Sequence, residues 1–330
     1  MYTLNPHYMD SDVAQQPTRA GFGRGLLEAG KLDETVVALC ADLTESTQMH
    51  LFREAYPDRF VEIGVAEQNL VTVASGMARA GKIPFTSSYA AFSPGRNWEQ
   101  IRTTICLNDQ PVKIIGSHAG VSVGPDGATH QMLEDIALMR VLPNMVVIAP
   151  GDAIEAQKAT LAIATNNQPS YLRLAREKTP IFSSEASAFE IGKAYILRAG
   201  NDVSLLGTGT MTYQLLVLSR LLEAEGISSE VVHIPTIKPL DETTILESVK
   251  KTGRVVTAEE AQINGGFGGA IAELLAEKSP APLHRIGIRD HFGESGQPGE
   301  LLEKFKLTAA TMQPEVSQFV KNVPQYKPGF

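Results

Sequence analysis

The sequence predicts an α/β fold made of two consecutive three-layer domains with mostly parallel sheets. Short apolar, β-rich segments alternate with longer helical segments along almost the whole chain. Buried strands joined by helices are typical of parallel sheets covered on both faces. The length of 330 residues fits two domains at roughly 150 residues each. Each domain then has enough residues to bury a core of its own.

The strands and helices of the first domain follow from its apolar periodicity. Helical patterns between the strands cover, among others, residues 97–107 and 152–165. A less periodic stretch, 176–194, then interrupts the alternation. Strands are expected at residues 35–43, 60–64, 83–89, 111–120, 144–150 and 170–175.

A second αβ series follows this interruption. Its expected strands are residues 202–209, 229–235, 254–260 and 283–288, and its expected helices are 211–225, 242–251 and 265–278. We therefore divide the chain into an N-terminal extension (1–16), a first domain (17–180), a linker (181–194), a second domain (195–320) and a surface tail (321–330).

Composition excludes several classes of protein. With 43% hydrophobic and 20% charged residues, the chain is not disordered. A net charge of −8 without a basic run argues against nucleic-acid binding or an acidic membrane surface. No apolar run approaches the ~18 residues of a membrane span, and the N-terminus lacks the basic start of a secretory signal. Cys40 and Cys106 are expected to be buried thiols, which fits a reducing cytoplasm.

Glu67 is the first candidate functional residue. A strand is expected to end near Gly64, and the following helix puts Glu67 on the same apolar face as Leu70, in the first turn. One interpretation is that the acid simply favours the helix dipole. The other is a desolvated carboxyl that could donate as well as accept a hydrogen bond.

A glycine-rich loop over residues 116–135 collects three further candidates. His118, Asp126 and His130 follow an expected strand, and ligands bind beyond the carboxyl ends of strands in parallel sheets. Imidazoles and a carboxylate there could handle protons or sugar hydroxyls. The alternative is a loop of mutually satisfied polar side chains. No His or Cys spacing in the sequence predicts a zinc site.

Two arginines also lie next to expected element ends. Arg19 opens the first helix, and Arg176 follows the strand at 170–175. Guanidinium groups suit phosphate, although a lone arginine is more often solvated or paired at the surface. The glycine-rich segments 207–211 and 264–269 match no nucleotide-binding motif, so we interpret them as tight strand-to-helix turns.

Five segments together resemble the C-terminal part of transketolase, over roughly residues 17–320. They are CADLTEST (40–47), EIGVAEQN (62–69), PFTSSYAAF (84–92), SHAGVSVGPDGATHQ (117–131) and YLRLARE (171–177). The resemblance implies a pyrimidine-binding domain followed by the transketolase C-terminal domain. It also implies the cofactors thiamine diphosphate and Mg²⁺.

The diphosphate-binding domain of the family is marked by GDG and a later Asn that hold Mg²⁺ and the diphosphate. This chain has no GDG. The resemblance therefore implies the C-terminal subunit of a split transketolase, with the metal ligands on a separate N-terminal subunit. Self-association into a dimer core, with shared active sites, is the family expectation. A neighbouring reading frame of about 270–300 residues bearing GDG would support this interpretation.

The same resemblance assigns roles to individual residues. Glu67 would bind N1′ of the aminopyrimidine, with Tyr89 and Phe92 as an aromatic wall whose third member is missing near Gly95 or Arg96. Asp42 would lie near the cofactor. With Glu67, two histidines would be catalytic: His118 close to the donor hydroxyls and His130 in the cofactor and substrate region. Asp126 would contact a donor hydroxyl. The sugar phosphate would be bound by Arg19, Ser46 and Arg176. The implied reaction is transfer of a two-carbon ketol unit from a ketose phosphate to an aldose phosphate.

Other functions remain open. Deoxyxylulose phosphate synthase and the beta subunits of 2-oxo acid dehydrogenases share the cofactor. A transketolase for an unusual sugar phosphate is a third possibility. A non-catalytic α/β interaction module is the alternative of another class. The retained Glu67 and aromatic pair argue against it.

Overall fold

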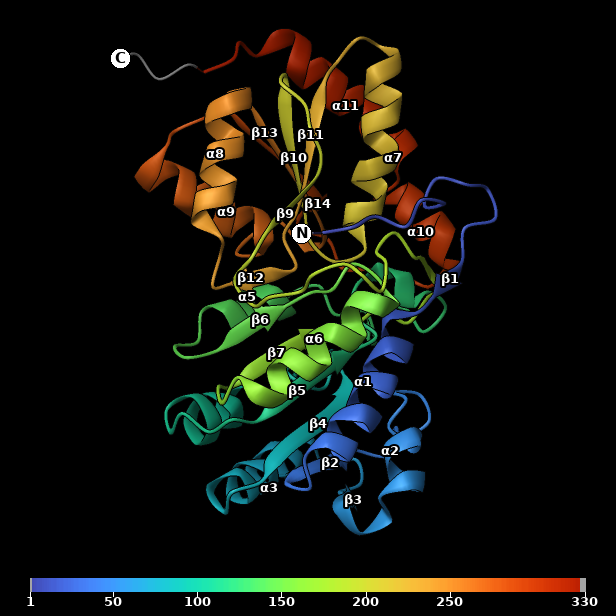
Figure 1. Ribbon diagram of the computed structural model, residues 1–330, viewed down its shortest axis with the longest axis vertical. Coiled ribbons are helices and arrows are strands. Elements are labelled where there is room, and N and C mark those ends of the chain that lie inside the picture. Colours follow the sequence, from blue (N-terminus) through green and yellow to red (C-terminus); the bar gives the residue numbers. More distant parts are fainter. Residues whose placement is uncertain (1, 327–330) are drawn as a thin grey trace.

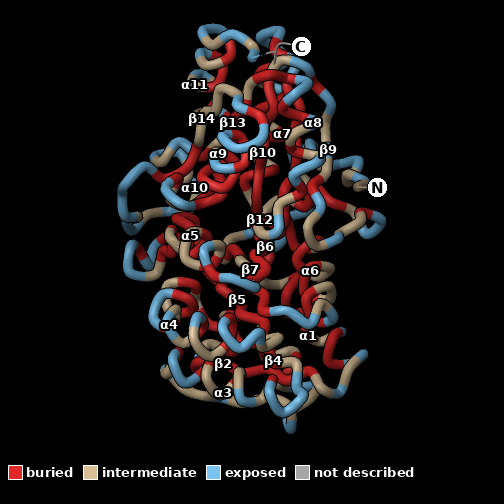
Figure 2. The backbone as a smooth tube through the Cα atoms, turned by 90° about the vertical axis from the view of Figure 1, so that its left-hand side faces the viewer, coloured by how far each residue is buried: buried red, intermediate tan, exposed pale blue. Residues whose placement is uncertain are grey.

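The computed structural model describes residues 2–326 and divides them between two α/β domains stacked along the long axis of the molecule (Figure 1). This confirms the predicted fold class. Figure 2 shows the buried backbone concentrated in the strands of both sheets, with exposed segments in the peripheral loops. Among the described residues, no helix has the length and apolar character needed to cross a bilayer.

The first domain is built on a seven-stranded sheet in the order β12-β6-β7-β5-β4-β2-β3. All its strands are parallel except β12, which pairs antiparallel with β6. The strands are β2 (Val36–Cys40), β3 (Phe60–Glu62), β4 (Ile83–Tyr89), β5 (Lys113–Ser117), β6 (Val146–Ile148), β7 (Ser170–Arg173) and β12 (Thr236–Lys238).

Alternating side chains of this sheet pack against two sets of helices. Val36 and Ala38 belong to a core shared with α1 (Thr18–Leu32), α2 (His50–Ala55) and α6 (Ala153–Thr165). Val37 and Leu39 face the opposite core. That second core includes α3 (Glu67–Arg79), α5 (Asp135–Arg140) and a segment in which the short α4 (Trp98–Gln100) continues as a π-helical turn (Ile101–Cys106). Cys40 and Cys106 are both free and buried, as predicted.

The second domain carries a five-stranded sheet in the order β14-β13-β10-β11-β9. Only the edge strand β9 runs antiparallel. The strands are β9 (Tyr195–Arg198), β10 (Val203–Gly207), β11 (Ser229–His233), β13 (Val255–Gln262) and β14 (Leu283–Ile288). The helices are α7 (Met211–Ala224), α8 (Glu242–Thr252), α9 (Phe267–Lys278), α10 (Pro298–Lys304) and α11 (Ala309–Asn322).

Several short features differ from the sequence prediction. The predicted extension contains β1 (Gln15–Gln16), which pairs with β8 (Thr179–Pro180). Strands β9 and β12 were not predicted. The predicted surface tail begins inside α11, and the Tyr326 N–H still bonds to the Gly253 carbonyl. The rest of that tail, residues 327–330, lies outside the described residues.

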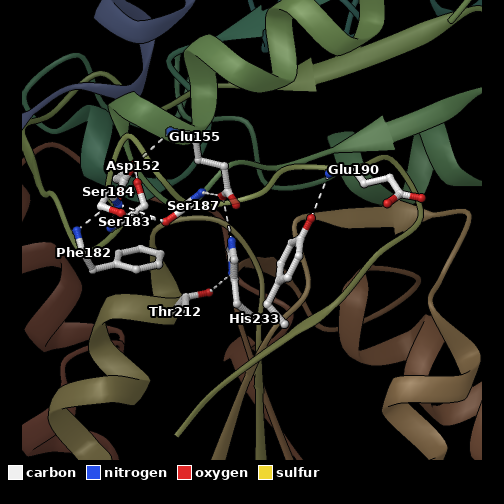
Figure 3. Close-up of polar contacts among 11 residues, drawn as sticks. Asp152, Glu155, Phe182, Ser183, Ser184, Ser187, Glu190, Thr212 and His233 are labelled. Atoms are coloured by element: carbon white, nitrogen blue, oxygen red, sulfur yellow. Dashed lines mark hydrogen bonds and ion pairs between the residues drawn. The ribbon is translucent and has the colours of Figure 1, made fainter. Parts of the chain in front are cut away.

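The two domains meet through buried polar contacts as well as through β12. His233 of β11 is fully buried between Glu155 of α6, at 2.7 Å from Nε2, and Thr212 of α7, at 2.7 Å from Nδ1 (Figure 3). In the same figure Asp152, at the start of α6, accepts the backbone N–H groups of Phe182 and Ser183. The N-terminal end of α6 therefore hydrogen-bonds both to the linker, through Asp152, and to the second domain, through Glu155.

Candidate active site

The predicted site residues gather at one edge of the seven-stranded sheet. Each follows the carboxyl end of a parallel strand or opens the helix after it, the edge where ligands bind in such sheets. The exception is Arg19, in the first turn of α1. The strands and residues are β2 with Asp42 and Ser46, β3 with Glu67, β4 with Tyr89 and Phe92, β5 with His118, Asp126 and His130, and β7 with Arg176.

Glu67 is the first residue of α3 and is only 4% exposed. Nη1 of Arg96 lies 3.4 Å from each carboxylate oxygen. The Asn97 side chain donates to the Glu67 carbonyl at 2.9 Å. The carboxylate thus has one distant cationic neighbour and keeps acceptor capacity for a further partner. Sequence reasoning missed Asn97, a lone amide that no motif marks.

Tyr89 and Phe92 form a stacked aromatic pair, with ring centroids 6.0 Å apart and planes inclined by 21°. The third aromatic has no room at Gly95, because a Cβ there would lie 1.9 Å from the Ala91 carbonyl oxygen. Instead the Arg96 guanidinium carbon lies 4.3 Å from the centre of the Phe92 ring, within the range of a cation–π contact. Arg96 therefore links the aromatic pair to Glu67.

Both predicted histidines lie against this aromatic pair. The His118 ring stacks on Tyr89 with centroids 3.8 Å apart, and its Nδ1 lies 2.8 Å from Ser117 Oγ. The His130 ring meets Phe92 edge-on at 5.3 Å. Burial, followed by the positive charges of Arg19 and Arg176, lowers the pKa of His118 to about 3. His118 is therefore a neutral hydrogen-bonding group near pH 7.

A chain of contacts joins the predicted phosphate residues to the histidines. Arg19 Nη1 donates to the Ser46 carbonyl at 2.6 Å, and the Tyr89 hydroxyl donates to Ser46 Oγ at 2.9 Å. Burial and the charge of Arg176 lower the pKa of Arg19. The buried Arg19 Nε finds no hydrogen-bond partner among the described residues. Two neighbouring guanidinium groups with an unused donor suit a bound anion.

Asp42 and Asp126 are the two site residues that the structure does not bring into this cluster. Both are exposed, and neither carboxylate has a hydrogen bond or ion pair with the described residues. Asp42 adopts a left-handed conformation with φ 58°. Its N–H donates to Glu62, which also accepts the Gly64 N–H. Glu62, not singled out from the sequence, thus ties the loop after β2 to the turn before α3.

An open pocket of about 510 Å³ lies beside the Glu67 carboxylate. Its wall includes Val65, which is 69% exposed although apolar. Across residues 2–326, no group of three or more His, Cys, Asp or Glu side chains is arranged to hold a metal ion. The pocket offers the buried Glu67 carboxylate as an acceptor, and Arg96, which also lines it, connects it to the Tyr89–Phe92 pair. A flat heterocycle can use both features, while an anion can bind at the arginine pair.

Comparison with known families agrees with the two-domain fold. Residues 14–181 match the transketolase pyrimidine binding domain, and residues 192–312 match the transketolase C-terminal domain. These two models define a class of α/β proteins that join a pyrimidine-binding domain to a second sheet domain. The chain belongs to the transketolase family.

Three relatives are similar over nearly their whole length. A protein of Methanocaldococcus jannaschii, provisionally described as a transketolase C-terminal section, is 44% identical over 92% of this chain and 96% of its own. The 6-deoxy-6-sulfo-D-fructose transketolase subunit SqwH of Clostridium sp. is 42% identical over 86% and 88%. A solved structure described as "Split gene transketolase, inactive beta4 tetramer" is 43% identical over 92% and 98%, with a TM-score of 0.87.

Proposed function

We propose that this chain is the C-terminal subunit of a two-chain transketolase of the cytoplasm. With a diphosphate-binding partner, it would transfer a two-carbon ketol unit from a ketose phosphate to an aldose phosphate. The observation that carries the proposal is the convergence of buried Glu67, the Tyr89–Phe92 pair and the two arginines at one sheet edge. The full-length similarity to separately encoded C-terminal sections supports a two-chain enzyme.

The residues present fit thiamine diphosphate. Among residues 2–326, the carboxylate oxygens of Glu67 have Arg96, at 3.4 Å, as their one hydrogen-bond partner. The stacked rings linked to it through Arg96 suit a planar pyrimidine. When bound, the cofactor supplies the nucleophilic carbon and the electron sink for cleaving the ketose. The chain's part is to hold the pyrimidine through Glu67, which would hydrogen-bond to ring N1′. Ligands for Mg²⁺ are assigned to the partner subunit.

The sugar phosphate would lie across the histidine face. Arg19, Ser46 and Arg176 would bind its phosphate, because the Arg19 Nε has no hydrogen-bond partner within residues 2–326 and both guanidinium groups carry positive charge. The neutral His118 would hydrogen-bond to donor hydroxyls, with His130 beside it. Asp126 would reach the donor, and Asp42 the cofactor region, only when substrate and partner close the site.

A sulfonated sugar is a second candidate substrate. The relative SqwH is named for 6-deoxy-6-sulfo-D-fructose, and a sulfonate, like a phosphate, can accept hydrogen bonds from two guanidinium groups. Assays of the two-chain enzyme with fructose 6-phosphate and with its 6-sulfo counterpart, each with an aldose phosphate acceptor, separate the two. If the chain belongs instead to a 2-oxo acid dehydrogenase or a deoxyxylulose phosphate synthase, the donor is a 2-oxo acid such as pyruvate, and neither ketose is used.

The variant Glu67→Ala tests the proposed role of Glu67 in binding the pyrimidine of the cofactor. In the complete enzyme with cofactor, we expect ketol transfer to fall at least about 100-fold, since positioned proton-transfer groups contribute roughly 10²–10⁴-fold. The far-UV circular dichroism and melting temperature should stay close to those of the unaltered chain. Glu67→Gln, which keeps the shape but not the charge, should be similarly inactive. Near-normal turnover in either variant would refute the role.

A further inference from the structure

The loop between the two histidines of the candidate site is held by residues of both domains. It covers residues 118–131, from His118 to the residue after His130, and its one regular element is a 3-10 turn, Val121–Val123. Its first half, through Gly124, is nevertheless buried. An irregular loop needs partners for its buried backbone groups. The first domain supplies the Leu174 carbonyl to the Ala119 N–H and the Arg176 guanidinium to the Val123 carbonyl, and the second domain supplies a partner to the Ser122 N–H.

Glu260, in β13, supplies the most buried of these contacts. Its side chain is 4% exposed, and Oε1 accepts the Ser122 N–H at 2.7 Å. A Cβ at Gly120, where φ is +89°, would lie 2.2 Å from the same oxygen. The loop therefore approaches the carboxylate at a position that only glycine allows, two residues after His118.

A second contact reaches the other end of the loop. Gln131 Nε2, next to His130, donates to the Glu294 carbonyl at 2.9 Å. A Cβ at Gly127 would lie 2.5 Å from Ser295 Oγ. The segment between β14 and α10 thus packs closely on the half of the loop that carries Asp126.

The first domain in turn fixes Glu260. Arg173 of β7 donates through Nη2 to the Glu260 carbonyl at 2.8 Å and through Nε to Asp135 at 2.8 Å. The first domain therefore fixes the backbone of Glu260, and this places its carboxylate within reach of the Ser122 N–H. The neighbouring Glu259 is equally buried, but within the described part of the chain its carboxylate accepts the N–H groups of Phe267 and Gly268 at the start of α9 and no hydrogen bond from the loop.

We propose that Glu260 is a positioning residue for ketol transfer, through which the second domain sets the place of the loop 118–131. This inference rests on the proposed function. It gives the C-terminal domain a part in the active site: its carboxylate holds the backbone from which His118 projects. Glu260 itself does not touch the histidines; it acts through the Ser122 N–H.

Truncation at the two neighbouring glutamates tests this. In the complete two-chain enzyme, Glu260→Ala should lower kcat/KM for the ketose donor by about 10- to 100-fold, the cost of misplacing groups by about 1 Å. Glu260→Gln should recover most of the loss, because its amide oxygen can accept the same N–H. Glu259→Ala removes an equally buried carboxylate and should lower the melting temperature while kcat/KM changes little. If Glu260→Ala does not fold, Glu260→Asp takes its place, since the shorter side chain cannot reach Ser122.

Hydrogen–deuterium exchange on the full chain gives a readout that does not depend on activity. Peptides covering 118–131 should exchange faster in Glu260→Ala than in Glu259→Ala and return to the unaltered rate in Glu260→Gln. Equal effects of the two alanine variants on both readouts, or no recovery in Glu260→Gln, would overturn the inference. If the unaltered enzyme transfers no ketol unit, the proposed function fails, and the exchange result alone decides whether Glu260 sets the loop.

Discussion

At the scale of single residues, the candidate site combines the buried acid Glu67, a pair of aromatic rings and two arginines with the neutral imidazole of His118. The sequence predicted most of these because each follows a strand end or opens a helix. It could not predict Arg96, which the missing aromatic only hinted at. Its position over Phe92 depends on the close backbone approach at Gly95, a three-dimensional constraint that residue spacing does not reveal.

The pKa of His118 gives a prediction on pH. Burial lowers it to about 3, so the ring should keep one neutral form between pH 5 and 8 in ¹⁵N NMR spectra of labelled protein. The unfolded imidazole takes up a proton near pH 6.5 and the folded one does not. The contribution of this residue to the free energy of unfolding therefore falls as pH drops from 6.5 toward 3. Titration of the folded ring near pH 6.5 would contradict the buried geometry.

Arg176→Ala should act on the phosphate rather than on the chemistry. We expect KM for phosphorylated sugars to rise about 10- to 100-fold, as hydrogen bonds to charged groups are worth roughly 1.5–3 kcal/mol. KM for a ketol donor without phosphate should hardly change. Arg24→Ala is the control. Arg24 lies in α1, as Arg19 does, but its guanidinium group donates to the side chains of Gln16 and Gln157 and is not assigned to the phosphate. Equal effects on both kinds of donor would rule out a phosphate role for Arg176.

At the scale of elements, the strands with continuous apolar sequence were predicted within a few residues, and β4 and β14 to the residue. Long buried strands carry their own signal. The short strands β9 and β12 do not, because each is formed by antiparallel pairing with a partner chosen by the tertiary fold. The π-helical turn at Ile101–Cys106 was likewise indistinguishable from α-helix by periodicity.

The crossing of α1 and α6 yields a stability prediction. A Cβ at Gly21 would lie 1.9 Å from the Ala153 carbonyl oxygen, so Gly21→Ala must push the two helices apart. We expect a loss of about 1–3 kcal/mol in the free energy of unfolding, measured by urea denaturation. Gly76→Ala in α3 is the matched control. Nothing lies within 4 Å of its added Cβ, so helix propensity should yield up to about 1 kcal/mol of stabilisation. The reverse order of the two variants would contradict the packing.

At the scale of the whole molecule, the second domain contributes a strand to the first domain's sheet and a carboxylate to the loop that carries His118. The sequence predicted two domains but not this interdependence. Ser122 and Glu260 are 138 positions apart, and no local pattern joins them. The same holds for His233 and Glu155, which meet across the junction (Figure 3).

The central claim is that this chain binds the pyrimidine side of thiamine diphosphate while another chain anchors its diphosphate. Calorimetric titration of thiamine diphosphate with Mg²⁺ into this chain, into a GDG-bearing partner and into their mixture tests it most directly. We predict tight binding only in the mixture, weakened by Glu67→Ala. Binding to this chain alone as tight as to the mixture, or ketol transfer by this chain alone, would contradict the account.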